Sequence, residues 1–122
     1  MKQLEELEGI KMPDKGFKLE KDFTTYWLGE LGKKGFWKKK WSDGSFDMKP
    51  YDCNIATPEA DYYCEIKVIK KDEFSLKVLR PNQLKALEDL TNLGKNAIVV
   101  IYSIEFNNYK VYKYSDLKKL FK

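Results

Sequence analysis

The unbroken apolar run from Ala97 to Tyr102 is the feature that most restricts what this chain can fold into. It is far shorter than the roughly 20 residues that a membrane span needs. A strand without alternating polar residues is typical of a sheet that is covered on both faces. Before it, residues 81–93 place leucines at helical spacing, and Gly94 follows them. We therefore expect a helix that leads into a central buried strand.

The rest of the pattern predicts a mixed sheet flanked by helices. Apolar residues at helical spacing predict a first helix over 16–31, and residues 36–41, 51–56, 61–69 and 109–114 have the character of strands. Ser115 is expected to cap a C-terminal helical stub. The expected order is αβββαββ plus a short C-terminal helix, an α/β fold. We place this single domain at 15–122, after an N-terminal segment, 1–14, that forms a short amphipathic turn or helix.

The chain contains no histidine, which excludes every mechanism that uses an imidazole as base, nucleophile or metal ligand. Chemistry here has to use carboxylates, lysine and a hard cation with oxygen ligands. Of the 23 basic residues, 22 are lysines and Arg80 is the exception. Lysines favour point-charge contact with phosphates over reading of guanine edges. A polyanionic partner is therefore expected, and sequence-specific readout is not.

The cysteine count and the N-terminal residues indicate the cellular compartment in which the protein is expected. The acidic first residues lack the apolar stretch of a secretion signal, and no apolar run is long enough to enter a membrane. Two cysteines, Cys53 and Cys64, are too few for a disulfide scaffold. We expect a cytoplasmic protein in which they are reduced and packed, the alternative being a cross-strand disulfide.

Three acid-x-lysine triplets occur, and only Glu65-Ile66-Lys67 lies in a predicted strand. Such triplets are typical of metal-dependent nucleases but also arise by chance in a chain this rich in both residue types. If 57–60 is a four-residue hairpin loop, antiparallel pairing sets Cys53 opposite Cys64 and Asp52 opposite Glu65. Directly paired residues share a face, and Lys67, two residues beyond Glu65, shares it too.

Two carboxylates at such a separation repel each other unless a cation lies between them. Asp52 and Glu65 are therefore candidate Mg²⁺ ligands, and Lys67 would position a water or offset charge on phosphoryl oxygens. The alternative is a solvent-exposed hairpin in which Lys67 is a cross-strand ion-pair partner. Glu20 and Gln83 also lie on apolar sides of their predicted helices, and both point to the same site. The alternative for each is a side chain at the edge of the core whose polar atoms are satisfied by the backbone.

A lysine cluster interleaved with aromatic residues follows the first predicted helix. It is a candidate for binding a nucleic-acid backbone, and its alternative is a solvated turn and strand face. The cluster consists of Lys33, Lys34, Lys38, Lys39 and Lys40, with Phe36, Trp37 and Trp41 between and beside them.

Taken together, these stretches resemble the PD-(D/E)xK nuclease superfamily, and within it Holliday junction resolvases of the RecU and Hjc kind. The resemblance covers about residues 15–115. The stretches that carry it are Leu19-Glu20-Lys21-Asp22-Phe23, Tyr51 to Ala56, Cys64-Glu65-Ile66-Lys67, Phe74-Ser75-Leu76-Lys77 and Asn82-Gln83-Leu84. Two features depart from the pattern: Tyr51 separates Pro50 from Asp52, and the loop 57–60 is shorter than the insertion of RecU-type proteins.

The resemblance implies a restriction-endonuclease-like fold and assigns roles to the candidate residues. A glutamate on the first helix, an aspartate on the second strand, and the glutamate and lysine of the third strand form the Mg²⁺ site. These roles fall on Glu20, Asp52, Glu65 and Lys67, with Gln83 in a supporting position. The resemblance also implies a homodimer that cuts two opposed strands of a four-way DNA junction, and Mn²⁺ is expected to substitute for Mg²⁺. The alternatives are a nuclease of this fold acting on other DNA and a non-catalytic nucleic-acid-binding module.

Overall fold

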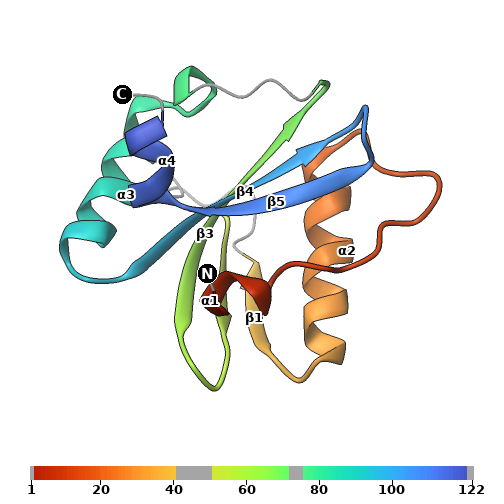
Figure 1. The fold of residues 1–122 in the computed structure, drawn as a ribbon, viewed down its shortest axis with the longest axis horizontal. Coiled ribbons are helices and arrows are strands. Elements are labelled where there is room, and N and C mark those ends of the chain that lie inside the picture. The colour runs from red at the N-terminus through yellow and green to blue at the C-terminus, as the bar shows by residue number, and fades with distance from the viewer. Residues whose placement is uncertain (1, 41–50, 72–75, 121–122) are drawn as a thin grey trace.

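The computed structural model describes residues 2–40, 51–71 and 76–120, which form a mixed five-stranded sheet flanked by helices (Figure 1). The elements are α1 (Lys2–Glu5), α2 (Glu20–Lys33), β1 (Trp37–Lys40), β2 (Cys53–Ala56), β3 (Asp61–Ile69), the 3-10 turn η1 (Leu76–Val78), α3 (Pro81–Asn92), β4 (Asn96–Ser103), β5 (Asn108–Lys113) and α4 (Tyr114–Leu120). The predicted α/β class and order are confirmed. Because α4 begins at Tyr114, Ser115 lies inside its first turn and is not its cap. Trp41, the triplet Asp47 to Lys49, Pro50 and residues 74–75 lie outside the described residues.

The strands lie in the order β1-β2-β3-β4-β5. Only β3 and β4 pair in parallel among the described strands, and α3 makes the crossover that a parallel pair requires. The hairpin of β2 and β3 has the predicted register, with Cys53 opposite Cys64. Every residue of β4 after Asn96 is buried, as expected for a central strand.

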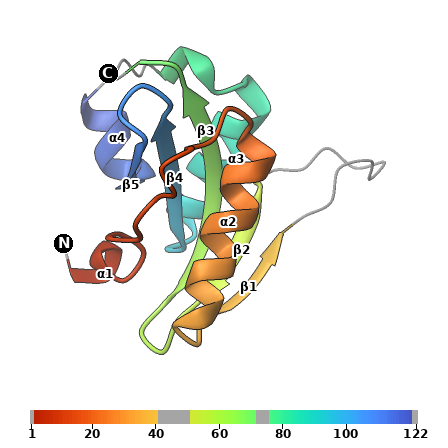
Figure 2. The ribbon, with the colours of Figure 1, turned by 90° about the vertical axis from the view of Figure 1, so that its right-hand side faces the viewer.

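Helices cover both faces of the sheet and create two hydrophobic cores. On one face α2 packs Phe23 and Trp27 against Tyr102 and its neighbours, and Figure 2 shows α2 lying across the sheet. On the other face Leu87 of α3 and Leu117 of α4 pack with residues of β4. Among the described residues, no helix combines the length and the apolar character that crossing a membrane demands.

The start of α2 at Glu20, later than the periodicity predicts, has a tertiary cause. Gly16 has a positive φ of +64°, and a Cβ there would lie 2.8 Å from the Tyr102 hydroxyl. The backbone N–H of Phe17 donates to that same hydroxyl at 2.9 Å. These contacts hold residues 16 and 17 against β4, so the helix begins only after them.

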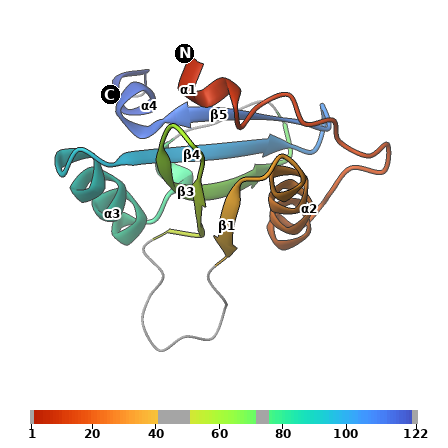
Figure 3. The same ribbon diagram turned by 90° about the horizontal axis from the view of Figure 1, so that it is seen from below.

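The N-terminal segment packs into the core on the α2 side of the sheet. Leu4, Leu7, Ile10 and Met12 are all buried, and the segment runs from beside β5 toward α2 (Figure 3). The Leu7 carbonyl accepts hydrogen bonds from Trp27 Nε1 at 3.2 Å and from the Tyr109 hydroxyl at 2.7 Å. Residues 4–12 therefore complete the same core as the rest of the sheet.

We predict that Leu7→Ala lowers the free energy of unfolding by about 2–5 kcal/mol, since it leaves a cavity under α2. Leu93→Ala is the matched control, because the Leu93 side chain is 73% exposed, and should change the value by less than about 0.5 kcal/mol. Urea unfolding followed by circular dichroism measures both. Equal, small effects of the two substitutions would mean that the N-terminal segment adds little to the stability of the core.

Candidate metal centre

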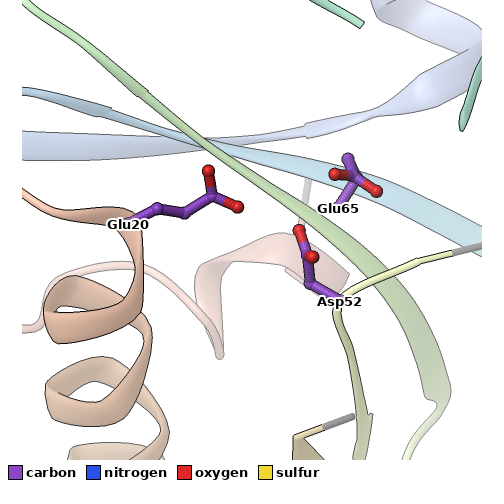
Figure 4. A group of neighbouring side chains, drawn as sticks. All are labelled: Glu20, Asp52 and Glu65. Carbon is purple, nitrogen blue, oxygen red and sulfur yellow. The ribbon is translucent and has the colours of Figure 1, made fainter. Parts of the chain in front are cut away.

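Three carboxylates from separate parts of the chain converge beside β3. Glu20 is the first residue of α2, Asp52 directly precedes β2, and Glu65 lies within β3. Figure 4 shows the three side chains pointing toward one another. One carboxylate oxygen of each lies within 4.8 Å of the others. The structure thus brings together the predicted acidic residues.

The position of Asp52 comes from a local irregularity in the hairpin. The β2–β3 pairing ends at Cys53 and Cys64, and the Asp52 N–H also donates to the Cys64 carbonyl, at 2.8 Å. Two successive residues therefore face one, as in a β-bulge, which often redirects a side chain near a functional site. Asp52 Oδ2 accepts the N–H of Ile66 at 2.7 Å. Asp52 thus lies one step off the regular register that would set it opposite Glu65, yet its carboxylate reaches the same place.

Glu65 is held by a chain of hydrogen bonds that begins at α3. The Arg80 N–H donates to Gln83 Oε1 at 2.9 Å, and Gln83 Nε2 donates to Glu65 Oε1 at 2.9 Å. Because a backbone N–H can only donate, it fixes which end of the Gln83 amide faces Glu65. The sequence signal for this bond is half of a capping box, in which a glutamine three residues after the helix N-cap accepts the N-cap backbone N–H. Gln83 thus contacts Glu65, as the resemblance implies, and is also satisfied by a backbone group, the N–H of Arg80.

In the described part of the chain, the other carboxylate oxygen of Glu65 is a buried, unsatisfied hydrogen-bond acceptor. The Glu65 side chain is only 1% exposed, and its Oε2 finds no hydrogen-bond partner among the described residues. Burial, followed by the charge of Asp52, raises the pKa of Glu65 to about 9. The charge of Glu20 acts in the same direction, while Lys67 opposes the rise and so lies close enough to act on the carboxylate.

The donor set fits a hard divalent cation such as Mg²⁺ or Mn²⁺. All three groups offer carboxylate oxygen, which these ions prefer, and a cation would satisfy the orphaned Glu65 Oε2. Two oxygens bound to one Mg²⁺ at about 2.1 Å lie at most about 4.2 Å apart. The carboxylate oxygens, which lie within 4.8 Å of one another, would therefore need to move inward only slightly to bind one ion.

The five lysines of the predicted cluster do not share one face. Lys38 and Lys40 extend toward α2, where Lys38 contacts Gly32 and Lys40 Nζ reaches Thr25 Oγ1 at 3.4 Å. Lys39 alternates with them and lies on the opposite face of β1. At the end of α2, Lys33 pairs with Glu30 at 2.6 Å and Lys34 donates to the Glu6 carbonyl at 3.2 Å. The lysines are thus spread over two faces and a helix end.

The two cysteines are free thiols without exposed surface, paired across β2 and β3 on the α2 side. Burial raises the pKa of the Cys64 thiol well above its usual value. A buried neutral thiol is a poor nucleophile, so both cysteines act here as small packed side chains.

The fold has a counterpart among solved structures. No protein-family model and no curated protein sequence matches the chain. Among solved structures it is similar to Hjc from Archaeoglobus fulgidus, described as a Holliday junction resolvase from an archaeal hyperthermophile. The match has a TM-score of 0.61 and 18% identity, and covers 78% of this chain and 77% of that one. The chain therefore has the mixed α/β fold of that resolvase, as the sequence predicts.

Without metal, we predict that the free energy of unfolding falls as the pH rises from 5 to 9. The pKa of Glu65 is about 9 in the folded protein against 4.5 ordinarily, so the native state keeps a proton that the unfolded state loses. The contribution of this proton to the free energy of unfolding is fully present below pH 4.5. It is lost as the pH rises toward 9, by at most about 1.4 kcal/mol per pH unit.

Denaturant unfolding in a chelator at pH 5.5, 7 and 8.5 measures this slope. Glu65→Gln should flatten it and melt at or above the wild-type temperature at pH 8.5, and Asp52→Asn should also melt no lower than wild type in chelator because it relieves repulsion. Glu59→Gln, at an exposed loop position, is the control and should keep the wild-type slope. A Glu65→Gln protein with the wild-type slope would contradict the buried, protonated state of Glu65.

Proposed function

We propose that this chain is a Mg²⁺-dependent DNA endonuclease whose preferred substrate is a four-way junction. The observation that carries the proposal is the convergence of Glu20, Asp52 and Glu65, with Lys67 and Gln83 beside them, on the fold of a resolvase. Mn²⁺ replaces Mg²⁺ because both take carboxylate oxygens. A four-way junction has two opposed strands to cut, so symmetric cleavage needs two copies of the centre and hence a homodimer.

Each residue has a defined task in this proposal. Asp52 and Glu65 hold the cation, Glu20 completes the carboxylate set, and Gln83 keeps Glu65 oriented by occupying its Oε1. A bound Mg²⁺ lowers the pKa of a coordinated water and offsets charge on the phosphoryl oxygens. Lys67, on the same face of β3 as Glu65, supplies a positive charge where the attacked phosphate gains negative charge.

The lysines of the cluster contribute differently to DNA binding. Lys33, Lys34, Lys38, Lys39 and Lys40 remain candidates for phosphate contacts, which act through charge and do not read sequence. Because they are spread over two faces, a single duplex does not meet all of them at once.

The decisive experiment is cleavage of four-way junction, flap and linear duplex DNA of equal strand length by the purified protein in Mg²⁺. We expect the junction to be cut fastest, and Asp52→Asn and Glu65→Gln each to abolish cleavage while the protein stays folded. Equal rates on all substrates would reject the junction preference and favour a nuclease of this fold with another DNA substrate. DNA binding without cleavage, and without a rise in melting temperature on adding Mg²⁺, would favour a binding module.

Lys67→Ala should lower the single-turnover cleavage rate by about 100-fold or more, while metal affinity stays within a few-fold of wild type. Lys70→Ala is the matched control, since Lys70 is an exposed lysine just past the end of the same strand, and should leave the rate nearly unchanged. Calorimetry with Mn²⁺ and quench-flow kinetics separate the two quantities. Lost metal affinity with a normal rate at saturating metal would show that Lys67 only organises the carboxylates.

A further inference from the structure

One half of the sheet on the α3 side carries an aromatic and basic surface that the metal centre does not use. The register aligns Lys39 of β1 with Asn54 of β2 and with Tyr63 of β3, so these three side chains share a face. Glu65 is two residues beyond Tyr63 and therefore lies on the same face. Trp37 lies two residues before Lys39, also on this face. The surface thus runs from the edge strand to the candidate metal centre.

In β2 and in the part of β3 paired with it, the α2 side is more deeply buried than the α3 side, whereas all four residues of β1 are exposed. On the α2 side, Cys53, Ile55 and Tyr62 are at most 1% exposed. On the α3 side, Trp37 is 57% exposed, Lys39 is exposed and Tyr63 is half-buried. The helix positions agree with this, since α3 and α4 pack against β4, which is three strands away from β1 in the sheet (Figure 3). Trp37 is the largest of the exposed apolar side chains among the described residues, and it shares its face with Lys39 and Tyr63.

The aromatic surface continues up to the carboxylates. Tyr51 directly precedes Asp52, and its ring meets the Tyr63 ring edge-on, with centroids 5.3 Å apart at 87°. Tyr63 is one repeat of the strand away from Glu65, which is roughly 7 Å. Rings therefore lie on this face from the edge strand to within about one nucleotide of the site where the phosphate would be cut.

The charges on this face fit a nucleic-acid strand. Lys39 follows Trp37 by two residues and is aligned with Tyr63 across Asn54, and Lys67 lies beyond Glu65 on the same face. Phosphates can follow these ammonium groups while bases meet the rings. In a stacked duplex the faces of the bases are covered by their neighbours, so only an unstacked nucleotide can lie on a tryptophan or tyrosine ring.

We propose that Trp37, Lys39 and Tyr63 form a stacking platform for unpaired nucleotides that adjoin the cleaved phosphate. This inference rests on the proposed nuclease function and narrows its substrate to DNA with an unpaired segment next to the cut. Branched and frayed DNA supply such a segment, and a fully paired linear duplex does not.

The test compares the affinity of the full chain for a blunt duplex and for the same duplex with a single-stranded overhang, in Ca²⁺ to prevent cleavage. Trp37→Gln should weaken overhang binding by about 10-fold and blunt-duplex binding by less than 2-fold, because it removes one stacked base. Trp37→Phe keeps a ring and should retain most of the preference. Lys38→Ala is the matched control from the other face of β1 and should change both affinities by the same factor.

Tryptophan fluorescence gives a second readout of base stacking on Trp37. Because the chain has three tryptophans and Trp27 is buried, this readout uses a protein that carries Trp41→Phe. Binding of an oligothymidine single strand should quench its tryptophan fluorescence, and adding Trp37→Phe should remove most of that quenching. Equal weakening on both DNAs would overturn the platform in favour of a contact that does not distinguish unpaired from paired DNA. A change in the oligomeric state of Trp37→Gln by sedimentation would overturn it in favour of a protein interface. If the overhang preference depends on Trp37 but no DNA is cut in Mg²⁺, the platform stands and the nuclease function fails.

Discussion

The hydrogen bond from the Gln83 amide to the Glu65 carboxylate joins α3 to the middle of the sheet. It satisfies one oxygen of a side chain that is almost wholly buried, while the other oxygen has no hydrogen-bond partner among the described residues. A buried carboxylate is costly unless it is protonated or compensated by a cation. Without a bound cation, burial therefore holds Glu65 in its protonated form, with a pKa raised to about 9, at the place where α3 meets the sheet. That is typical of a site built for a ligand and is hard to explain as a stabilising feature.

The centre depends on both hydrophobic cores at once. Glu20 reaches it from α2, which packs on one face, and Gln83 from α3, which packs on the other. The position of α2 depends in turn on the N-terminal segment, whose Leu7 carbonyl binds the Trp27 indole. A change far from the carboxylates that shifts either helix would thus alter the distance between ligand oxygens. The tolerance would be small, because a Mg²⁺ ion held by these carboxylates demands near-ideal octahedral geometry at about 2.0–2.1 Å.

The sequence predicts much of this arrangement because its signals are local. The hairpin register follows from the four-residue loop 57–60, and the buried strand follows from the apolar run 97–102. The displacement of Asp52 could not be predicted, since the bond between its carboxylate and the Ile66 N–H forms only after the strands have paired. The packing of residues 4–12 was missed for a similar reason, because their contacts lie on α2, on β3 and the loop before it, and on β5, which are distant in the sequence.

The contact between Leu7 and Tyr109 also bears on how the chain reaches its fold. The two residues are 102 positions apart, so the hydrogen bond closes a loop of nearly the whole sequence. Contacts of such separation are slow to form, and during synthesis the first residues leave the ribosome long before β5 exists. Until then, the apolar side chains of the leading segment and the aromatic face of α2 have no complete partner. We therefore expect the N-terminal segment to be among the last parts of the chain to dock during folding.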